Sequence, residues 1–221
     1  MDRIIRVTGK GKISVKPDTI RLNISLEDIR ETYEETLKQS SEQTELLKDC
    51  FEKLGFDRND LKTLYFNVDT EYGRYQDRNK DWQRKFVGYK FTHRFKLDFP
   101  SDNERLGKVL YSLAHCPIHP EFSIAYTVKD MEQCKNQLLG RAVADSKQKA
   151  EILTQEVGTK LGQVITIDYS WGEMGIISRP MNRMMEPCMA MEDCCEGSYD
   201  MDIEPDDIDV SDTVTVVWSL E

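Results

Sequence analysis

The chain has 221 residues, of which 39% are hydrophobic and 32% are charged, and its formal net charge is −10 at pH 7. This composition excludes wholesale disorder, the acidic excess argues against general nucleic-acid binding, and no apolar run approaches the roughly 20 residues of a membrane span. The N-terminus MDRIIRVTGKGK lacks the apolar core of a secretory signal, so we expect a soluble, cytoplasmic protein with free thiols.

The stretch GKGKISVKPDTI (residues 9–20) contains two glycines and raises the question of a phosphate-binding loop. Such a loop needs a helix to begin directly after it. Apolar residues instead alternate over 5–15 and 20–26, which is the period of a β-strand. We therefore predict a long hairpin that turns at Pro17-Asp18, in which the glycines permit a bulge or the close approach of another segment.

The following elements alternate between helical and extended periodicity. A stripe spaced by three and four residues predicts a helix over 31–54, which Gly55 ends. The other predicted elements are strands at 64–68 and 89–99, a short helix capped by Ser101 or Asp102, a strand at 122–128, a long helix at about 130–157, and strands at 165–169 and 208–220. The stripe expected to be buried on the long helix is Leu139, Ala142, Val143, Ser146, Ala150, Leu153 and Val157. The last strand is strongly apolar, so we expect it to pair inside a sheet.

The predicted order of elements is ββαββαβαββ. Half-buried strands that are joined partly by hairpins favour antiparallel or mixed sheets with helices on one face. We therefore expect an α+β fold whose sheets are covered by two long helices and one short helix. The length fits a single domain over residues 1–221, or two subdomains at about 1–84 and 85–221, with a long irregular loop at 171–207.

Five stretches together resemble the SIMPL domain family. They are, in chain order, GKGKISVKPDTI, LKTLYFNVDTEY, VGYKFTHRFKLDF, GRAVADSKQKAEILTQEVGTKLGQVITI and VSDTVTVVWSL, and they span nearly the whole chain. The family includes exported bacterial proteins of the periplasmic immunogenic type and a kinase-associated animal adaptor. The resemblance implies an α+β domain, a tendency to form homo-oligomers and links to stress responses, with no established catalytic residues.

Residues 171–207 contain an unusual concentration of sulfur and acid. Thioether and thiolate groups are soft donors that Cu(I) prefers, and their oxidation turns apolar side chains polar. One hypothesis is therefore a soft-metal site or redox-responsive contact formed by Met184, Cys188, Met189, Met191, Cys194 and Cys195. The simpler interpretation is that the methionines pack a loop against a neighbouring surface. The spacing matches no closed metal site such as paired CxxC motifs, so we expect no cofactor.

Two histidine-containing stretches offer weaker candidate sites. In AHCPIHP, His115, Cys116 and His119 could bind zinc, but a proline breaks the helix between them, and a turn that contains histidines is the simpler interpretation. His93 lies between two phenylalanines on the apolar face of its strand, where we expect a core histidine bonded to the backbone. No serine, cysteine or carboxylate stands in a context that marks a nucleophile or general acid, so we expect no enzymatic activity.

The segment EYGRYQDRNKDWQRKFVGYK (residues 71–90) interleaves basic and aromatic side chains. Such a pattern can bind single-stranded nucleic acid, but Asp77 and Asp81 dilute the charge. The pattern equally suits a twisted, solvent-exposed hairpin. We therefore expect no nucleic-acid partner.

The charge of the chain is unevenly distributed. No lysine or arginine follows Arg183, whereas twelve acids occur from Glu186 to Glu221. The basic aromatic segment and the acidic methionine-rich loop are two long irregular insertions of opposite sign, and we hypothesise that they dock on each other between protomers, with charges at the rim. The residues expected in this contact are Arg74, Arg78, Trp82, Arg84, Glu192 and Asp193.

The sequence thus favours a non-enzymatic oligomeric scaffold or protein-interaction module. Its expected partner is a second copy of the chain or another protein. The alternative is a soft-metal-binding or redox-responsive protein that uses the Met/Cys-rich loop.

Overall fold

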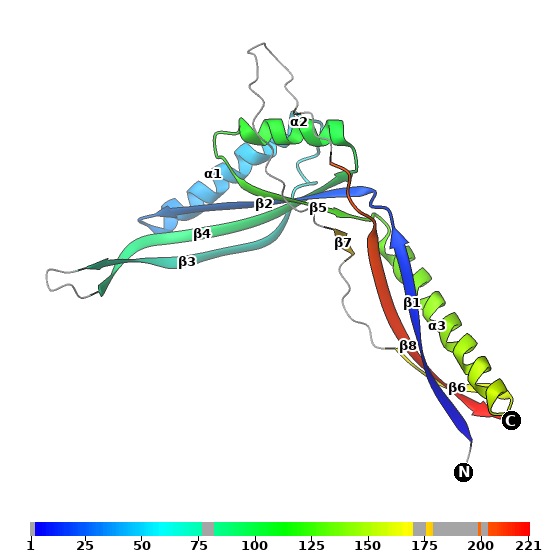
Figure 1. Ribbon diagram of the computed structural model, residues 1–221. Helices are drawn as coiled ribbons and strands as arrows, with labels where there is room; N and C mark the ends of the chain where they lie inside the picture. The colour runs from blue at the N-terminus through cyan, green and yellow to red at the C-terminus, as the bar shows by residue number, and fades with distance from the viewer. Residues whose placement is uncertain (1–2, 77–81, 170–175, 179–198, 200–202) are drawn as a thin grey trace. The chain divides into compact units, whose positions relative to one another are not determined.

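The computed structural model describes residues 3–76, 82–169, 176–178, 199 and 203–221 (Figure 1). Within these residues, three helices and two antiparallel sheets form an α+β fold. This confirms the predicted fold class and element order, to which the structure adds the two-residue strand β7 (Ile177–Ser178).

The chain divides into two compact units that interleave along the sequence. Unit 1 comprises Met1–Asp18, Thr127–Ser178 and Pro205–Glu221, and unit 2 comprises Thr19–Tyr126 and Arg179–Glu204. Residues 84 and 85, the expected boundary between two subdomains, both lie within strand β4 of unit 2. Most of the predicted loop at 171–207 lies outside the described residues.

Unit 1 is built on a sheet with the strand order β1-β8-β6 (Figure 1). The strands are β1 (Ile4–Val15), β8 (Ile208–Leu220) and β6 (Leu161–Asp168), and helix α3 (Met131–Glu156) packs against them. The apolar C-terminal strand β8 lies between the other two, which confirms that it pairs inside a sheet. Val214, Val216 and Trp218 of β8 are buried together with Ala142 and Ala150 of α3.

Helix α3 lies directly on the backbone of β1. A Cβ atom built on Gly11 would stand 2.1 Å from the carbonyl oxygen of Leu138, so glycine permits the close approach that the sequence predicts. The side chains of α3 that are buried recur every four residues, namely Cys134, Leu138, Ala142, Ser146, Ala150 and Thr154. The predicted stripe is partly wrong, since Leu153 and Val157 are exposed. The buried stripe consists mostly of small side chains because a close backbone contact leaves no room for larger ones.

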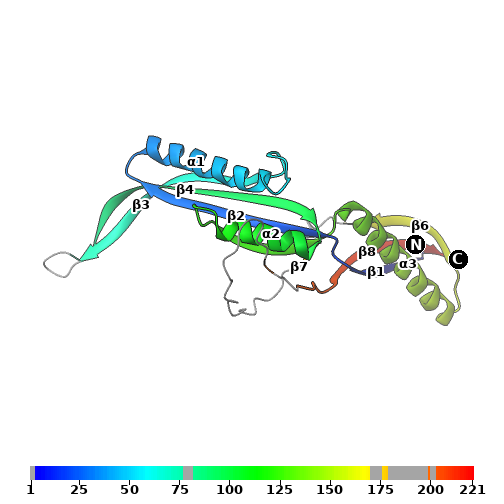
Figure 2. The same cartoon turned by 90° about the horizontal axis from the view of Figure 1, so that it is seen from above.

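In unit 2, strands β3, β4, β2 and β5 lie side by side in that order, and two helices cover one face (Figures 1 and 2). The elements are β2 (Thr19–Arg30), α1 (Tyr33–Glu52), β3 (Lys62–Gln76), β4 (Trp82–Pro100), α2 (Asn103–Ala114) and β5 (Glu121–Thr127). A single apolar core joins the helices to the sheet; among its fully buried members are Leu47, Phe91 and Leu106. Burial of each such side chain contributes roughly 1.5–3 kcal/mol to stability.

Side-chain caps determine where the helices of unit 2 begin. Thr32 Oγ1 accepts a hydrogen bond from the Glu35 backbone N–H at 3.2 Å and donates one to Glu35 Oε2 at 2.9 Å, so Thr32 caps the N-terminus of α1. Asp102 caps α2, because its Oδ1 accepts from the backbone N–H groups of Glu104 and Arg105.

The predicted hairpin between residues 5–15 and 20–26 is wrong. β1 pairs with β8, whereas β2 pairs with β4, so these consecutive strands belong to different sheets. The turn between them bonds to a distant segment instead: the Asp18 backbone N–H donates to the Thr127 carbonyl at 3.2 Å, and Asp18 Oδ1 accepts from the Lys129 N–H at 2.7 Å. Alternating apolar residues indicate a strand but not which strand it pairs with.

Strands β3 and β4 continue past the end of β2 as a two-stranded ribbon (Figures 1 and 2). The last residue of β2 lies opposite Tyr89, but β3 and β4 stay paired out to Gln76 and Trp82. We name residues 71–76 and 82–88 the arm. The expected solvent-exposed hairpin is confirmed, while the expectation of an irregular insertion is wrong for the described part of this segment.

Candidate functional site

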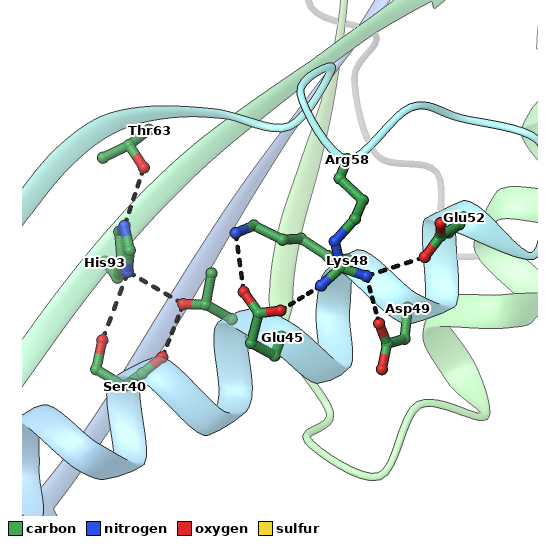
Figure 3. A network of polar contacts seen from close by, with 9 residues as sticks. Ser40, Glu45, Lys48, Asp49, Glu52, Arg58, Thr63 and His93 are labelled. Carbon is green, nitrogen blue, oxygen red and sulfur yellow. Dashed lines mark hydrogen bonds and ion pairs between the residues drawn. The ribbon is translucent and has the colours of Figure 1, made fainter.

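His93 of β4 forms a polar contact between helix α1 and the sheet of unit 2 (Figure 3). Its Nδ1 lies 3.3 Å from Thr44 Oγ1 and 3.5 Å from Ser40 Oγ, both on α1, and its Nε2 lies 3.1 Å from Thr63 Oγ1. The ring also packs against Phe95, with 3.9 Å between ring centroids. The expected backbone partner is wrong, because the imidazole contacts side-chain hydroxyls from two elements.

The surroundings of His93 favour its neutral form. Burial lowers the pKa of His93 to about 4, and the positive charge of Lys48 acts in the same direction. Hydroxyl groups suit a neutral imidazole because they can donate to one ring nitrogen and accept from the other. A general base works best with a pKa near the operating pH, so this histidine has the character of a contact that fixes α1 on the sheet.

Arg58 gathers three carboxylates of helix α1 beside this contact (Figure 3). Its Nη1 lies 2.6 Å from Asp49 Oδ1 and 2.9 Å from Glu52 Oε2, and its Nη2 pairs with Glu45 Oε2. Glu45 also accepts from Lys48 Nζ at 2.9 Å. The hydrogen bonds that Arg58 donates to Asp49 and Glu52 raise the pKa of Arg58 above its usual value. Arg58 and the three carboxylates that it binds lie at the surface, so solvent screens their charges. We conclude that the network holds the segment after α1 in place and does not form a reactive site.

A pocket of about 510 Å³ opens between α1 and α2 in unit 2. It is lined by Cys50, Lys53, Leu54, Lys108, Tyr111, Ser112, His115 and Pro117. Its volume lies in the range of small-molecule sites. The lining combines two ammonium groups, an imidazole and a thiol with apolar and aromatic surface, which suits an anionic ligand.

Two thiols meet at this pocket. Cys50 Sγ lies 3.3 Å from Cys116 Sγ, although the two residues are 66 positions apart in the chain. Cys50 is partly exposed in the pocket, whereas Cys116 is only 1% exposed. Burial and the hydrogen bond shared with Cys116 raise the pKa of Cys50 to about 11. Cys50 is thus held mainly as a thiol at neutral pH.

The segment AHCPIHP forms the turn after α2. His115 Nδ1 bonds the Tyr111 carbonyl oxygen at 2.8 Å, and His119 adopts a left-handed backbone with φ 42°. Cys116 lies against Cys50. Within the described part of the chain, no group of three or more His, Cys, Asp or Glu side chains is placed to hold a metal ion.

One face of the arm brings together aromatic and basic side chains. Directly opposite pairs on this face are Tyr72 with Phe86, Arg74 with Arg84, and Gln76 with Trp82. We name these six residues the arm face. Tyr72 is 44% exposed, Phe86 43% and Trp82 70%, and the Arg84 guanidinium stands 5.0 Å from the centre of the Tyr72 ring. Exposed Trp, Tyr and Arg side chains are typical of the residues that dominate protein interfaces.

The cations of the arm lack ion-pair partners within the described structure. None of the salt bridges among the described residues involves Arg74, Arg84 or Lys85. Arg74 and Arg84 instead lie opposite each other, and like charges in such a pair destabilise the ribbon. The arm is therefore an exposed aromatic surface whose cations form no salt bridge with any described residue.

A comparison with known protein families shows which family the chain belongs to. The model of the SIMPL family, described as a protein of unknown function (DUF541), matches residues 5–218. The chain belongs to the SIMPL family. This confirms the predicted resemblance over nearly its whole length.

Two curated proteins are similar to this SIMPL chain at lower identity. They are the 26 kDa periplasmic immunogenic proteins of Brucella melitensis biotype 1 (25% identical) and Brucella abortus strain S19 (24% identical). Each match covers 74% of this chain and 65% of the relative, so it spans slightly less than two thirds of the relatives' length. In the described portion of the SIMPL chain, no helix combines the length and apolar character needed to cross a membrane.

Several predicted site residues of this SIMPL protein lie outside the described residues. They are Met184, Cys188, Met189, Met191, Cys194 and Cys195 of the soft-metal hypothesis, and Arg78, Glu192 and Asp193 of the predicted oligomer contact. Both hypotheses stay predictions for these positions. Of the expected contact residues that are described, Arg74, Trp82 and Arg84 share the arm face.

Sequence reasoning missed the contact between Cys50 and Cys116. Cys50 lies between Leu47 and Phe51 of the buried stripe of α1 without belonging to that stripe, and Cys116 stands beside histidines that suggested zinc. No local pattern could have paired them, because the packing of α1 against α2 brings the two segments together.

Proposed function

We propose that this SIMPL protein is a non-enzymatic interaction module that assembles with a second copy of itself through the arm face. The observation that carries this proposal is the combination of exposed Tyr72, Trp82 and Phe86 with Arg74 and Arg84 on one face of a ribbon, where neither cation forms a salt bridge with a described residue. Aromatic anchors supply buried area in an interface, and charges at its rim select the partner.

Binding to a partner would stabilise the arm. A two-stranded hairpin is at best marginally stable by itself in water. The contacts that support the arm from within are edge-on aromatic pairs, with ring centroids 5.8 Å apart for Tyr72 and Phe86 and 5.4 Å apart for Phe86 and Tyr89. A docked acidic surface would add buried area and relieve the repulsion between Arg74 and Arg84.

The chain carries an acidic surface of the required sign. Glu204, Asp206, Asp207 and Asp209 precede or begin β8 and are exposed. No salt bridge among the described residues includes any of them. They belong to the segment after Arg183 that contains acids but no lysine or arginine. Attraction between this segment and the arm face of another protomer gives the proposed contact its specificity.

A charge-swap experiment tests the contact. We expect Arg74→Glu with Arg84→Glu to lower the mass measured by light scattering, and Asp206→Lys with Asp207→Lys to do the same. Mixing the two variants should restore a large particle, because the reversed charges attract again. The wild-type particle should also shrink as salt is raised, since the Debye length falls from about 10 Å at 0.1 M to about 3 Å at 1 M.

Lys85→Glu is the matched control. Lys85 lies opposite Gly73, on the other face of the same ribbon, so this substitution changes charge without changing the arm face. We expect it to leave the mass unchanged. A wild-type protein that stays monomeric at all concentrations, or an Arg74→Glu/Arg84→Glu variant with the wild-type mass, would contradict the proposal.

Elemental analysis with thiol titration, on protein purified without an affinity tag, distinguishes this function from the soft-metal alternative. Self-assembly through the arm requires a metal-free oligomer. Stoichiometric metal that is lost when Cys188, Cys194 and Cys195 are replaced by serine would favour the alternative instead.

A further inference from the structure

Cys50 and Cys116 are placed so that they can form a disulfide. A covalent S–S bond measures about 2.05 Å, so their sulfurs, now 3.3 Å apart, need to approach by about 1.2 Å. Cys50 lies in the last turn of α1, and Cys116 lies two residues beyond the end of α2. Helix ends tolerate small shifts more readily than helix centres, so unit 2 can close this bond without rearranging its core.

The two thiols differ in their access to solvent. Cys50 lines the pocket between α1 and α2, whereas Cys116 is 1% exposed and does not line it. A reagent that enters the pocket therefore meets Cys50 first. Among the described thiols, Cys116 contacts Cys50, which gives the pair an order of reaction.

The pocket lining selects for negative charge. Among the described residues that line the pocket, the titratable groups besides Cys50 and Tyr111 are Lys53 from the end of α1 and Lys108 and His115 from α2 and its cap, and none of them is a carboxylate. Lys108 also pairs with Glu104 at 2.8 Å, and Asp49 lies one turn from Lys53 on α1. Leu54, Tyr111 and Pro117 add apolar surface, so the volume of about 510 Å³ fits a ligand the size of a short peptide.

We propose that this pocket binds anionic low-molecular-weight disulfides and that Cys50 and Cys116 reduce them. In the first step the Cys50 thiolate attacks one ligand sulfur: a bond between Cys50 and the ligand forms, the ligand S–S bond breaks, and one thiolate leaves and takes a proton from water. In the second step Cys116 loses its proton to water and attacks Cys50 Sγ, which releases the second thiolate. The protein dithiol is oxidised to a disulfide, and the ligand disulfide is reduced to two thiols.

The rate of the first step depends on pH. Burial and Cys116 keep Cys50 protonated, and Asp49 adds to this effect while Lys53 opposes it. The thiolate fraction of a group well below its pKa rises about tenfold per pH unit, and the thiolate is the nucleophile. The reaction should therefore accelerate about tenfold per unit between pH 7 and pH 9.

The test compares two disulfide probes of opposite charge on the reduced, full-length protein. Glutathione disulfide is anionic and cystamine is cationic, and alkylation followed by peptide mapping measures the crosslinked peptide that contains Cys50 and Cys116. We expect Lys53→Gln with Lys108→Gln to slow crosslinking by glutathione disulfide at least about threefold, and to leave crosslinking by cystamine unslowed. Lys38→Gln is the matched control, because Lys38 is an exposed lysine near the other end of α1.

A second variant tests the thiol–disulfide exchange independently of the charge of the probe. Cys116→Ser should trap glutathione on Cys50 as a mixed disulfide, whereas Cys134→Ser, which changes a buried thiol of unit 1, should leave the crosslink intact. Failure of glutathione disulfide to crosslink Cys50 with Cys116 would overturn the proposal. Equal slowing of both probes by the lysine substitutions would overturn the anionic ligand class. The Arg74→Glu/Arg84→Glu variant should react at the wild-type rate, so this outcome is independent of assembly.

Discussion

A Cβ atom built on Gly9 of β1 would stand 2.0 Å from the carbonyl oxygen of Ala142 in α3. The same contact contains a buried hydrogen bond, which Ser146 Oγ donates to the Val7 carbonyl oxygen at 3.0 Å. Helix and strand thus meet backbone to backbone in unit 1. The short distance between the two backbones determines how the rest of α3 packs on the sheet.

We expect Gly9→Ala to lower the free energy of unfolding by roughly 2–3 kcal/mol, because backbone atoms of α3 would have to move away from the new methyl group. Gly140→Ala is the matched control, since a Cβ at that α3 position meets nothing within 4 Å. It should raise stability by about 0.5–1 kcal/mol through helix propensity. Urea unfolding measures both changes. Equal effects of the two substitutions would argue against the close contact.

At Tyr126 we predict that a substitution stabilises the protein. Its hydroxyl is buried and has no hydrogen-bond partner among the described residues, and burial raises the pKa of this phenol. Tyr126→Phe should therefore stabilise the protein by about 1 kcal/mol. Tyr169→Phe should destabilise it by a similar amount, because the Tyr169 hydroxyl donates to Asp212 Oδ2 at 3.0 Å. Thermal unfolding monitored by circular dichroism tests both, and a clear loss of stability in Tyr126→Phe would show that this hydroxyl is bonded.

His93 should make the stability of unit 2 depend on pH. Its pKa is about 4 in the folded chain against an ordinary value of 6.5, so between these limits the unfolded chain binds a proton that the folded chain resists. Stability should therefore fall by on the order of 2 kcal/mol as the pH is lowered from about 6.5 to 4. His93→Gln should flatten this part of the pH profile, measured by urea unfolding. His119→Asn, at an exposed turn position, should leave the profile as in the wild type.

Substitution of Trp82 distinguishes an effect on assembly from an effect on folding. The side chain is 70% exposed at the end of the arm, so Trp82→Ala should change the free energy of unfolding of a protomer by no more than about 0.5 kcal/mol. If the arm face contacts a second copy, the same substitution should raise the dissociation constant measured by analytical ultracentrifugation at least about tenfold. An unchanged dissociation constant would remove Trp82 from the contact.

Local periodicity predicts much of this fold. Strands β1, β2 and β8 and helix α2 lie where alternation and helical spacing place them, and the apolar sequence of β8 correctly indicates a central strand. The arm was harder to predict as regular strand. Aromatic and charged residues occur at both sets of alternate positions, so the apolar contrast that marks a strand with one buried face is absent.

The amino-acid sequence by itself determined the α+β class, the order of the elements, the family and the opposite charges of the arm and the C-terminal segment. Only the tertiary structure decided that β1 pairs with β8 rather than β2, that Gly9 lies on Ala142, and that Cys50 meets Cys116. The physical reason is the separation along the chain between the residues that interact. Periodicity reports neighbours two to four residues away, whereas strand partners and thiol contacts depend on which distant segments pack together to bury the most apolar surface.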